Sequence, residues 1–231
     1  MKTKIMKAIC LCLALVLCFG SPISVSAAEV AGATIDETQK GSLTIFKYDL
    51  TNSENDGVWD SSYVSTGVAD ESGVNETMKN YALEGVEFSF VKVADIVQFT
   101  ESTADTRTDS HVEVLYAIDK TKGADFLKAL GLADGKNRYE KADALDASKY
   151  FYQSDVLISA LSSGLTANAT TVKNAMERYA ATNGTAMPLT DSYGKSKVEN
   201  LPLGLYLVAE TKVPEMVVST TDPFLVSVPM T

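Results

Sequence analysis

The feature that most constrains the fold is a set of short alternating segments near both ends of the chain, with helical periodicity between them. In these segments apolar and polar residues alternate with a period of two, and β-branched and aromatic residues are frequent. Such a pattern predicts β-strands. The predicted strands are residues 41–50, 86–91, 111–118, 197–200, 204–211, 216–219 and 224–228.

The segment between these groups of strands contains apolar residues at helical spacing. A helix is expected over 155–162, with Ser154 as its cap and Gly164 as its stop, and a second over 172–179, ending at Asn183-Gly184. A shorter helix is expected over 124–130, and the polar stretch 51–79 is expected to be a long loop. Strands at both ends with helices between them predict a mainly β protein, a β-sandwich that carries a helical insertion.

The first 27 residues have the order of a secretory signal peptide. Three lysines precede an unbroken apolar run, Ala8 to Phe19, and small residues around Ala27 offer a cleavage site. A retained anchor is the alternative, but a membrane-spanning helix needs about 20 apolar residues and this run is shorter. We therefore expect an exported protein in which residues 28–40 form a flexible leader.

Composition excludes several classes of function. All three cysteines, Cys10, Cys12 and Cys18, lie in the signal segment, so the mature chain is expected to have no disulfide, catalytic thiol or zinc-thiolate site. The net charge of −10 argues against nucleic acid and anionic membranes as partners.

His111 is the only histidine and no G-x-S-x-G motif accompanies it. A calcium-loop-like stretch begins at Asn52 but has Tyr63 at its twelfth position, so a solvated acidic loop is favoured. No enzyme activity, cofactor or metal is expected.

Two charged residues share the parity of apolar strand positions. Lys47 has the parity of Leu43 and Ile45, and Glu210 has that of Tyr206 and Val208. If these parities face the core, both charges are buried, and a buried ion needs a partner or must lose its charge. The residues at the alternate positions of these two strands are also apolar, so the pattern does not decide which set faces the core. The alternative is that Lys47 and Glu210 lie at strand ends in contact with water. Lys92, which shares parity with Phe88 and Phe90, is a second inward lysine or an ordinary strand-end lysine.

Four segments resemble motifs of one family. Residues 205–214 resemble the pilin E-box, 41–48 the first strand that carries a bond-forming lysine, 83–88 the opening of the second strand, and 222–231 a late strand. Together they are similar to the N-terminal domain of Gram-positive sortase-assembled pilus backbone subunits (major pilins), with a collagen-adhesin B-type-like isopeptide motif. The resemblance implies an Ig-like β-sandwich over residues 41–231, truncated before its final strand.

The resemblance also implies roles for single residues. In that family a lysine amine attacks an asparagine carboxamide beside a carboxyl group that shuttles protons, and an intramolecular isopeptide bond forms. Lys47 would be the nucleophile and Glu210 the proton shuttle. Burial favours the uncharged forms that this chemistry needs. The acceptor is expected beyond Thr231, and Asp222 would be a stand-in that loses water instead of ammonia.

The implied function is structural. The chain would be a subunit of a cell-wall-anchored pilus that supports adhesion, exported to the cell surface and polymerised by a sortase through a lysine beyond this fragment. Its partners would be other pilin subunits, a sortase and host or matrix surface ligands. The alternative is a secreted or cell-surface adhesin, or a tip pilin, whose recognition region is inserted at about residues 95–185.

Overall fold

The computed structural model describes residues 13–15, 35–36, 38–59, 74–101, 111–215 and 220–229. The predicted strand 216–219 and most of the expected signal peptide lie outside these residues. The strands are β1 (Leu13–Leu15), β2 (Lys40–Phe46), β3 (Glu87–Glu101), β4 (His111–Asp119), β5 (Lys149–Tyr152), β6 (Thr185–Ala186), β7 (Lys195–Pro202), β8 (Gly204–Lys212) and β9 (Phe224–Val228). The helices are α1 (Leu50–Asn55), α2 (Val74–Met78), α3 (Ala124–Ala129), α4 (Ser154–Asn183) and the short 3-10 turns η1 (Lys79–Tyr81), η2 (Ala133–Gly135) and η3 (Glu140–Ala142).

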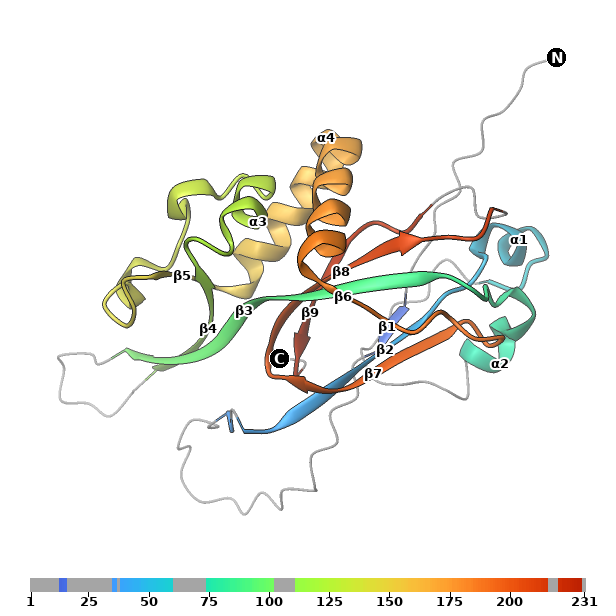
Figure 1. The fold of residues 1–231 in the computed structure, drawn as a ribbon, viewed down its shortest axis with the longest axis horizontal. Helices are drawn as coiled ribbons and strands as arrows, with labels where there is room; N and C mark the ends of the chain where they lie inside the picture. The colour runs from blue at the N-terminus through green and yellow to red at the C-terminus, as the bar shows by residue number, and fades with distance from the viewer. Residues whose placement is uncertain are drawn as a thin grey trace.

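The strands form two antiparallel sheets (Figure 1). The smaller has the order β1-β2-β7, and the larger has the order β5-β4-β3-β8-β9 with β6 paired to β3. The two sheets enclose a core to which β2 contributes Leu43 and Ile45, and β3, β8 and β9 contribute Phe88, Val208 and Val228. The predicted mainly β sandwich with a helical insertion is confirmed.

The helical insertion covers the other face of the larger sheet. Helices α3 and α4 lie over that face (Figure 1). Their side chains pack against residues of β3, β4, β5 and β8. A β-bulge between Lys92 and Ala94 shifts the register of β3, so Val93, Ala94 and Ile96 all join this helix-covered cluster. Because the helices cover one face of the larger sheet and the smaller sheet covers the other, β8 is buried on both faces, with Leu207 and Ala209 beneath the helices and Tyr206 and Val208 between the sheets.

Several local predictions were wrong. The two helices expected over 155–162 and 172–179 form one element, α4, which is interrupted only by non-helical dihedral angles at Asn168. Gln153 precedes the helix as its cap, without a side-chain hydrogen bond, so the predicted cap Ser154 is the first helical residue. The stretch 51–79, expected to be a loop, contains most of α1, all of α2 and the first residue of η1. The third helix was placed correctly, since α3 spans Ala124–Ala129.

The first strand lies inside the expected signal segment. Residues Leu13–Leu15 of β1 pair antiparallel with Thr44–Phe46 of β2. The cysteines, the three lysines and the expected cleavage site lie outside the described residues. No helix in the described part of the chain is both long and apolar enough to cross a membrane.

Candidate functional site

Lys47 lies directly after β2, with its side chain fully buried. Its Nζ is 2.8 Å from Glu210 Oε2 and 2.7 Å from the Thr221 hydroxyl. Its backbone is also held, because its N–H donates to the carbonyl of Gly194 and its carbonyl accepts from the N–H of Leu83. Gly194 has φ +71°, and a Cβ there would stand 2.3 Å from the Lys47 carbonyl oxygen. The backbone of Lys47 is therefore fixed by a contact that only glycine allows.

Glu210 enters the site from the end of β8. It lies opposite Phe88 of β3 in the sheet and shares the inter-sheet face with Tyr206 and Val208. Its Oε2 accepts hydrogen bonds from Lys47 Nζ and from the backbone N–H of Thr221, at 2.8 Å each. Its Oε1 is buried and has no hydrogen-bond partner within the described ranges. One carboxyl oxygen is thus fixed, and the other is available to an additional group.

Thr221 completes the cluster. It lies in the connection between β8 and β9 and is 6% exposed. Its hydroxyl accepts from Lys47 Nζ, and its N–H donates to Glu210, so it contacts both charged residues. Sequence reasoning missed it because position 221 lies outside any strand or helix, where no periodicity predicts burial. The motif-like segment 222–231 begins one residue later and does not include it.

The Lys47–Glu210 pair joins the two sheets of the sandwich. Both side chains have 0% exposure, so neither charge is shared with water. The free-energy cost of removing two charges from water is about equal to, or larger than, the gain from their mutual attraction. A buried ion pair is therefore weak evidence for a purely stabilising role. A hydrogen bond of 2.8 Å also fits the uncharged combination of an amine and a carboxylic acid. The inward orientation considered from the sequence is confirmed for both residues.

The other sequence-derived candidates lie elsewhere. Asp222 follows Thr221, but its carboxylate is 61% exposed and lies 3.3 Å from Lys173 of α4. Lys92 is exposed, and its Nζ lies 2.8 Å from Asp95. The calcium-like stretch begins within α1, where the Asp49 side chain accepts from the Asn52 N–H. Within the described ranges, no three His, Cys, Asp or Glu side chains form a group that would hold a metal ion.

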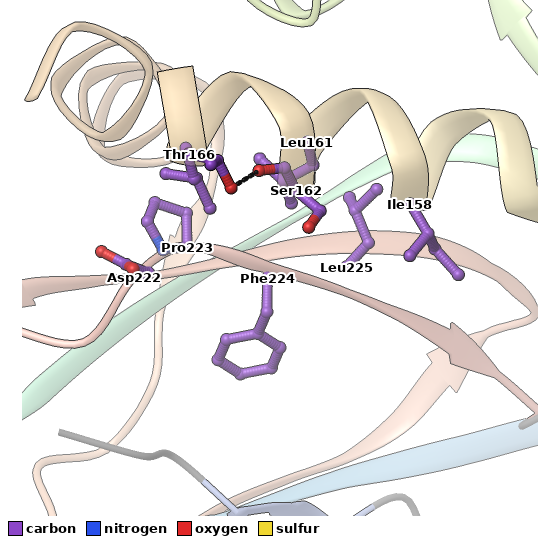
Figure 2. Close-up of a pocket in the computed structure, with 9 residues that line it drawn as sticks. Ile158, Leu161, Ser162, Thr166, Asp222, Pro223, Phe224 and Leu225 are labelled. Carbon is purple, nitrogen blue, oxygen red and sulfur yellow. Dashed lines mark hydrogen bonds between the residues drawn. The ribbon is translucent and has the colours of Figure 1, made fainter. Parts of the chain in front are cut away.

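An apolar groove runs beside this region, between α4 and β9 (Figure 2). It has a volume of about 450 Å³. In Figure 2, Ile158 and Leu161 of α4 face the segment from Asp222 to Leu225, while the ring of Phe224 points away from the helix. Ile158 is 56% exposed at the edge of the groove. Asp222 lies at one end of this surface feature, whereas Lys47 is buried between the sheets.

Comparisons with known proteins give only partial similarity. No protein-family model matches the chain, and no curated protein matches it. A structure of the pilus backbone RrgB from Streptococcus pneumoniae is 19% identical, with 63% of this chain and 30% of that chain covered and a TM-score of 0.22. Two full-length RrgB structures are 16% and 17% identical, cover 62% and 63% of this chain and 22% and 23% of theirs, and have TM-scores of 0.20 and 0.21. The chain spans less than a third of each, and these values are too low to assign a family or a function.

Proposed function

We propose that this chain is a structural module of an exported bacterial surface polymer, a sortase-assembled pilus backbone subunit, in which Lys47 and Glu210 serve an internal amide cross-link. The observation that carries this proposal is the fully buried Lys47–Glu210 pair, which connects the two sheets. A lysine and a glutamate at these positions agree with the motifs around 41–48 and 205–214.

The chemical case rests on the environment of the pair. An amine must be uncharged to attack a carbonyl carbon, and removal from water disfavours the ammonium form. A carboxyl group 2.8 Å away is within reach to take and return the protons. The reaction happens once within one molecule, so the protein is not an enzyme in the turnover sense.

The carboxamide partner is the missing component. By the family resemblance we expect an asparagine in the sequence that follows Thr231. Asp222 is disfavoured as a stand-in because its carboxylate is held by Lys173 on the surface. The module would be exported to the cell surface, with other pilin subunits and a sortase as partners.

The test is the intact mass of the natural protein, isolated from its own cell surface or secreted from its host. We expect the mature chain to be lighter than its sequence by one ammonia per cross-link, and fragment spectra to join the peptide of Lys47 to an asparagine peptide. A Lys47→Ala variant should restore the full mass. A mass equal to that of the sequence, with Lys47 unmodified, would refute the cross-link. The alternative function, a secreted or cell-surface adhesin module, would then be favoured.

A further inference from the structure

We propose that Thr221 is a third functional residue of the Lys47–Glu210 site, orienting the lysine amine for attack, and that Lys173 of α4 holds Thr221 in place. This inference rests on the proposed function. It assigns a task to a residue that carries no motif and to a helix that the cross-link chemistry does not otherwise use.

The first step concerns the lone pair on the lysine nitrogen. A neutral amine has two N–H bonds and one lone pair. In the structure Nζ donates to Glu210 Oε2 at 2.8 Å and to the Thr221 hydroxyl at 2.7 Å. With both N–H bonds directed at these two oxygens, the lone pair is the position left for attack on a carbonyl carbon. Loss of the Thr221 hydroxyl removes one of these two hydrogen bonds, so the direction of the lone pair is held less tightly.

The second step concerns the two oxygens of Glu210. The N–H of Thr221 and the amine of Lys47 both donate to Oε2, while Oε1 is buried without a partner in the described part of the chain. When Glu210 is protonated, this pattern places the proton on Oε1, because Oε2 already accepts two hydrogen bonds. Oε1–H is then the group that donates to the oxygen of an incoming carboxamide.

The atoms of the reaction balance in this arrangement. Nζ bonds to the carboxamide carbon as Oε1 gives its proton to the carboxamide oxygen, and the attacking nitrogen then gives one proton to Glu210. Glu210 passes that proton to the amide nitrogen, the C–N bond breaks and ammonia leaves. The oxygen returns its proton to Glu210, which ends as it began. Thr221 exchanges no proton and acts by orientation alone.

The third step concerns what holds Thr221. Its two neighbours in sequence are attached to α4, because Lys173 Nζ donates to the carbonyl of Thr220 at 2.7 Å and lies 3.3 Å from the Asp222 carboxylate. The Thr220 hydroxyl also contacts Glu177 at 3.5 Å. Helix α4 therefore holds the segment between β8 and β9 by contacts to the residues on both sides of Thr221. Lys173 touches no reacting atom, so it is a positioning residue.

The experiment uses the full natural chain, including any sequence that follows Thr231. It is synthesised in a cell-free reaction, and the loss of ammonia is followed over time by intact mass. Thr221→Val keeps the shape and the backbone N–H but removes the hydroxyl, whereas Thr221→Ser keeps the hydroxyl. Thr44→Val is the matched control, since Thr44 is a fully buried threonine of β2 whose hydroxyl has no partner in the described ranges.

We expect Thr221→Val to slow bond formation about tenfold, the effect of one lost orienting hydrogen bond. Thr221→Ser should stay within about twofold of the wild type, and Thr44→Val should match it. Lys173→Met tests the same idea without altering the buried cluster, and it should also slow the reaction. Its control is Lys149→Met, which removes a similarly exposed lysine whose Nζ lies 2.9 Å from Asp95.

The outcomes separate the two proposals. A wild-type chain that never loses ammonia refutes the proposed function, and the role of Thr221 with it. A wild-type chain that loses ammonia while Thr221→Val reacts equally fast, or while Thr221→Ser is as slow as Thr221→Val, overturns the role of Thr221 alone. If Thr221→Val does not fold, Lys173→Met decides: a wild-type rate overturns the proposal, and a slowed rate beside an unaffected Lys149→Met supports it.

Discussion

Removing both members of the Lys47–Glu210 pair should destabilise the fold no more than removing one of them. In Lys47→Met, Glu210 stays buried with only the Thr221 N–H as donor to Oε2 and with no partner for Oε1 within the described ranges. In Glu210→Gln, the ammonium of Lys47 stays buried without its counter-charge. An uncompensated buried charge costs about 3–5 kcal/mol. In the double variant both charges are gone and the shapes are nearly kept, so its cost should not exceed that of the larger single change.

The assay is urea denaturation of this 231-residue chain, on protein whose intact mass equals the sequence mass, so that no cross-link contributes. For a chain of this size, 3–5 kcal/mol corresponds to a melting temperature lower by about 6–20 °C. The control cycle uses Lys149→Met and Asp95→Asn, because Asp95 is 50% exposed and a surface pair contributes about 0–1 kcal/mol.

Two results would refute this reasoning. The first is a single variant of the buried pair that costs less than about 1 kcal/mol, which is the range of a solvated pair. The second is a double variant that costs the sum of the two single changes. Additive costs would mean that the two side chains do not interact in the folded protein.

Three further predictions concern neighbouring residues. Thr44→Val should leave the free energy of unfolding unchanged or raise it, because the hydroxyl that it removes is buried without a partner in the described part of the chain, and urea denaturation will show this. Gly194→Ala should destabilise the protein by well over 1 kcal/mol in thermal melts, whereas Gly57→Ala, with a similar φ of +68° and nothing within 4 Å, should cost only the strain of its positive φ. Burial raises the pKa of Glu177 above 4.5, Lys173 opposes this shift, and Glu210 and Asp222 add to it. Glu177 therefore binds more protons in the folded state than in the unfolded state. Its contribution to stability falls as the pH rises from about 4.5 through the raised pKa. Glu177→Gln should remove that fall in a pH series of urea midpoints, and an unchanged pH profile would contradict the assignment.

The inward orientation of Lys47 and Glu210 was only half predictable. The alternating pattern placed Lys47 and Glu210 on apolar faces of their strands. Because β8 is buried on both faces, this pattern alone did not identify the face on which Glu210 lies. The resemblance to the pilin motifs favoured the inward orientation, and both side chains are buried in the structure. Thr221 was not predictable, because its burial depends on the tertiary contacts of α4 with a connection that has no periodic pattern.

The continuity of α4 shows a second limit of sequence reasoning. Gly164 suggested a helix stop, yet it lies within the helix, and a Cβ at that position would stand 3.2 Å from Val172. The glycine therefore serves close packing across the bend at Asn168 instead of ending the helix. The helix-forming residues on either side were identified correctly, but the join between them depends on packing that a local pattern does not contain.

The 15-residue strand β3 has a consequence for the cooperativity of unfolding. Its first half pairs with β8 of the sandwich, and its second half pairs with β4, which leads into the helical region. One continuous strand is thus shared by both halves of the molecule, and side chains from it enter the core on each side. Opening of the helical region would break the hydrogen bonds between β4 and β3, the strand whose Phe88 lies opposite Glu210. We therefore expect amide protons in both halves of β3 to exchange with the same free energy of opening, as a single unit.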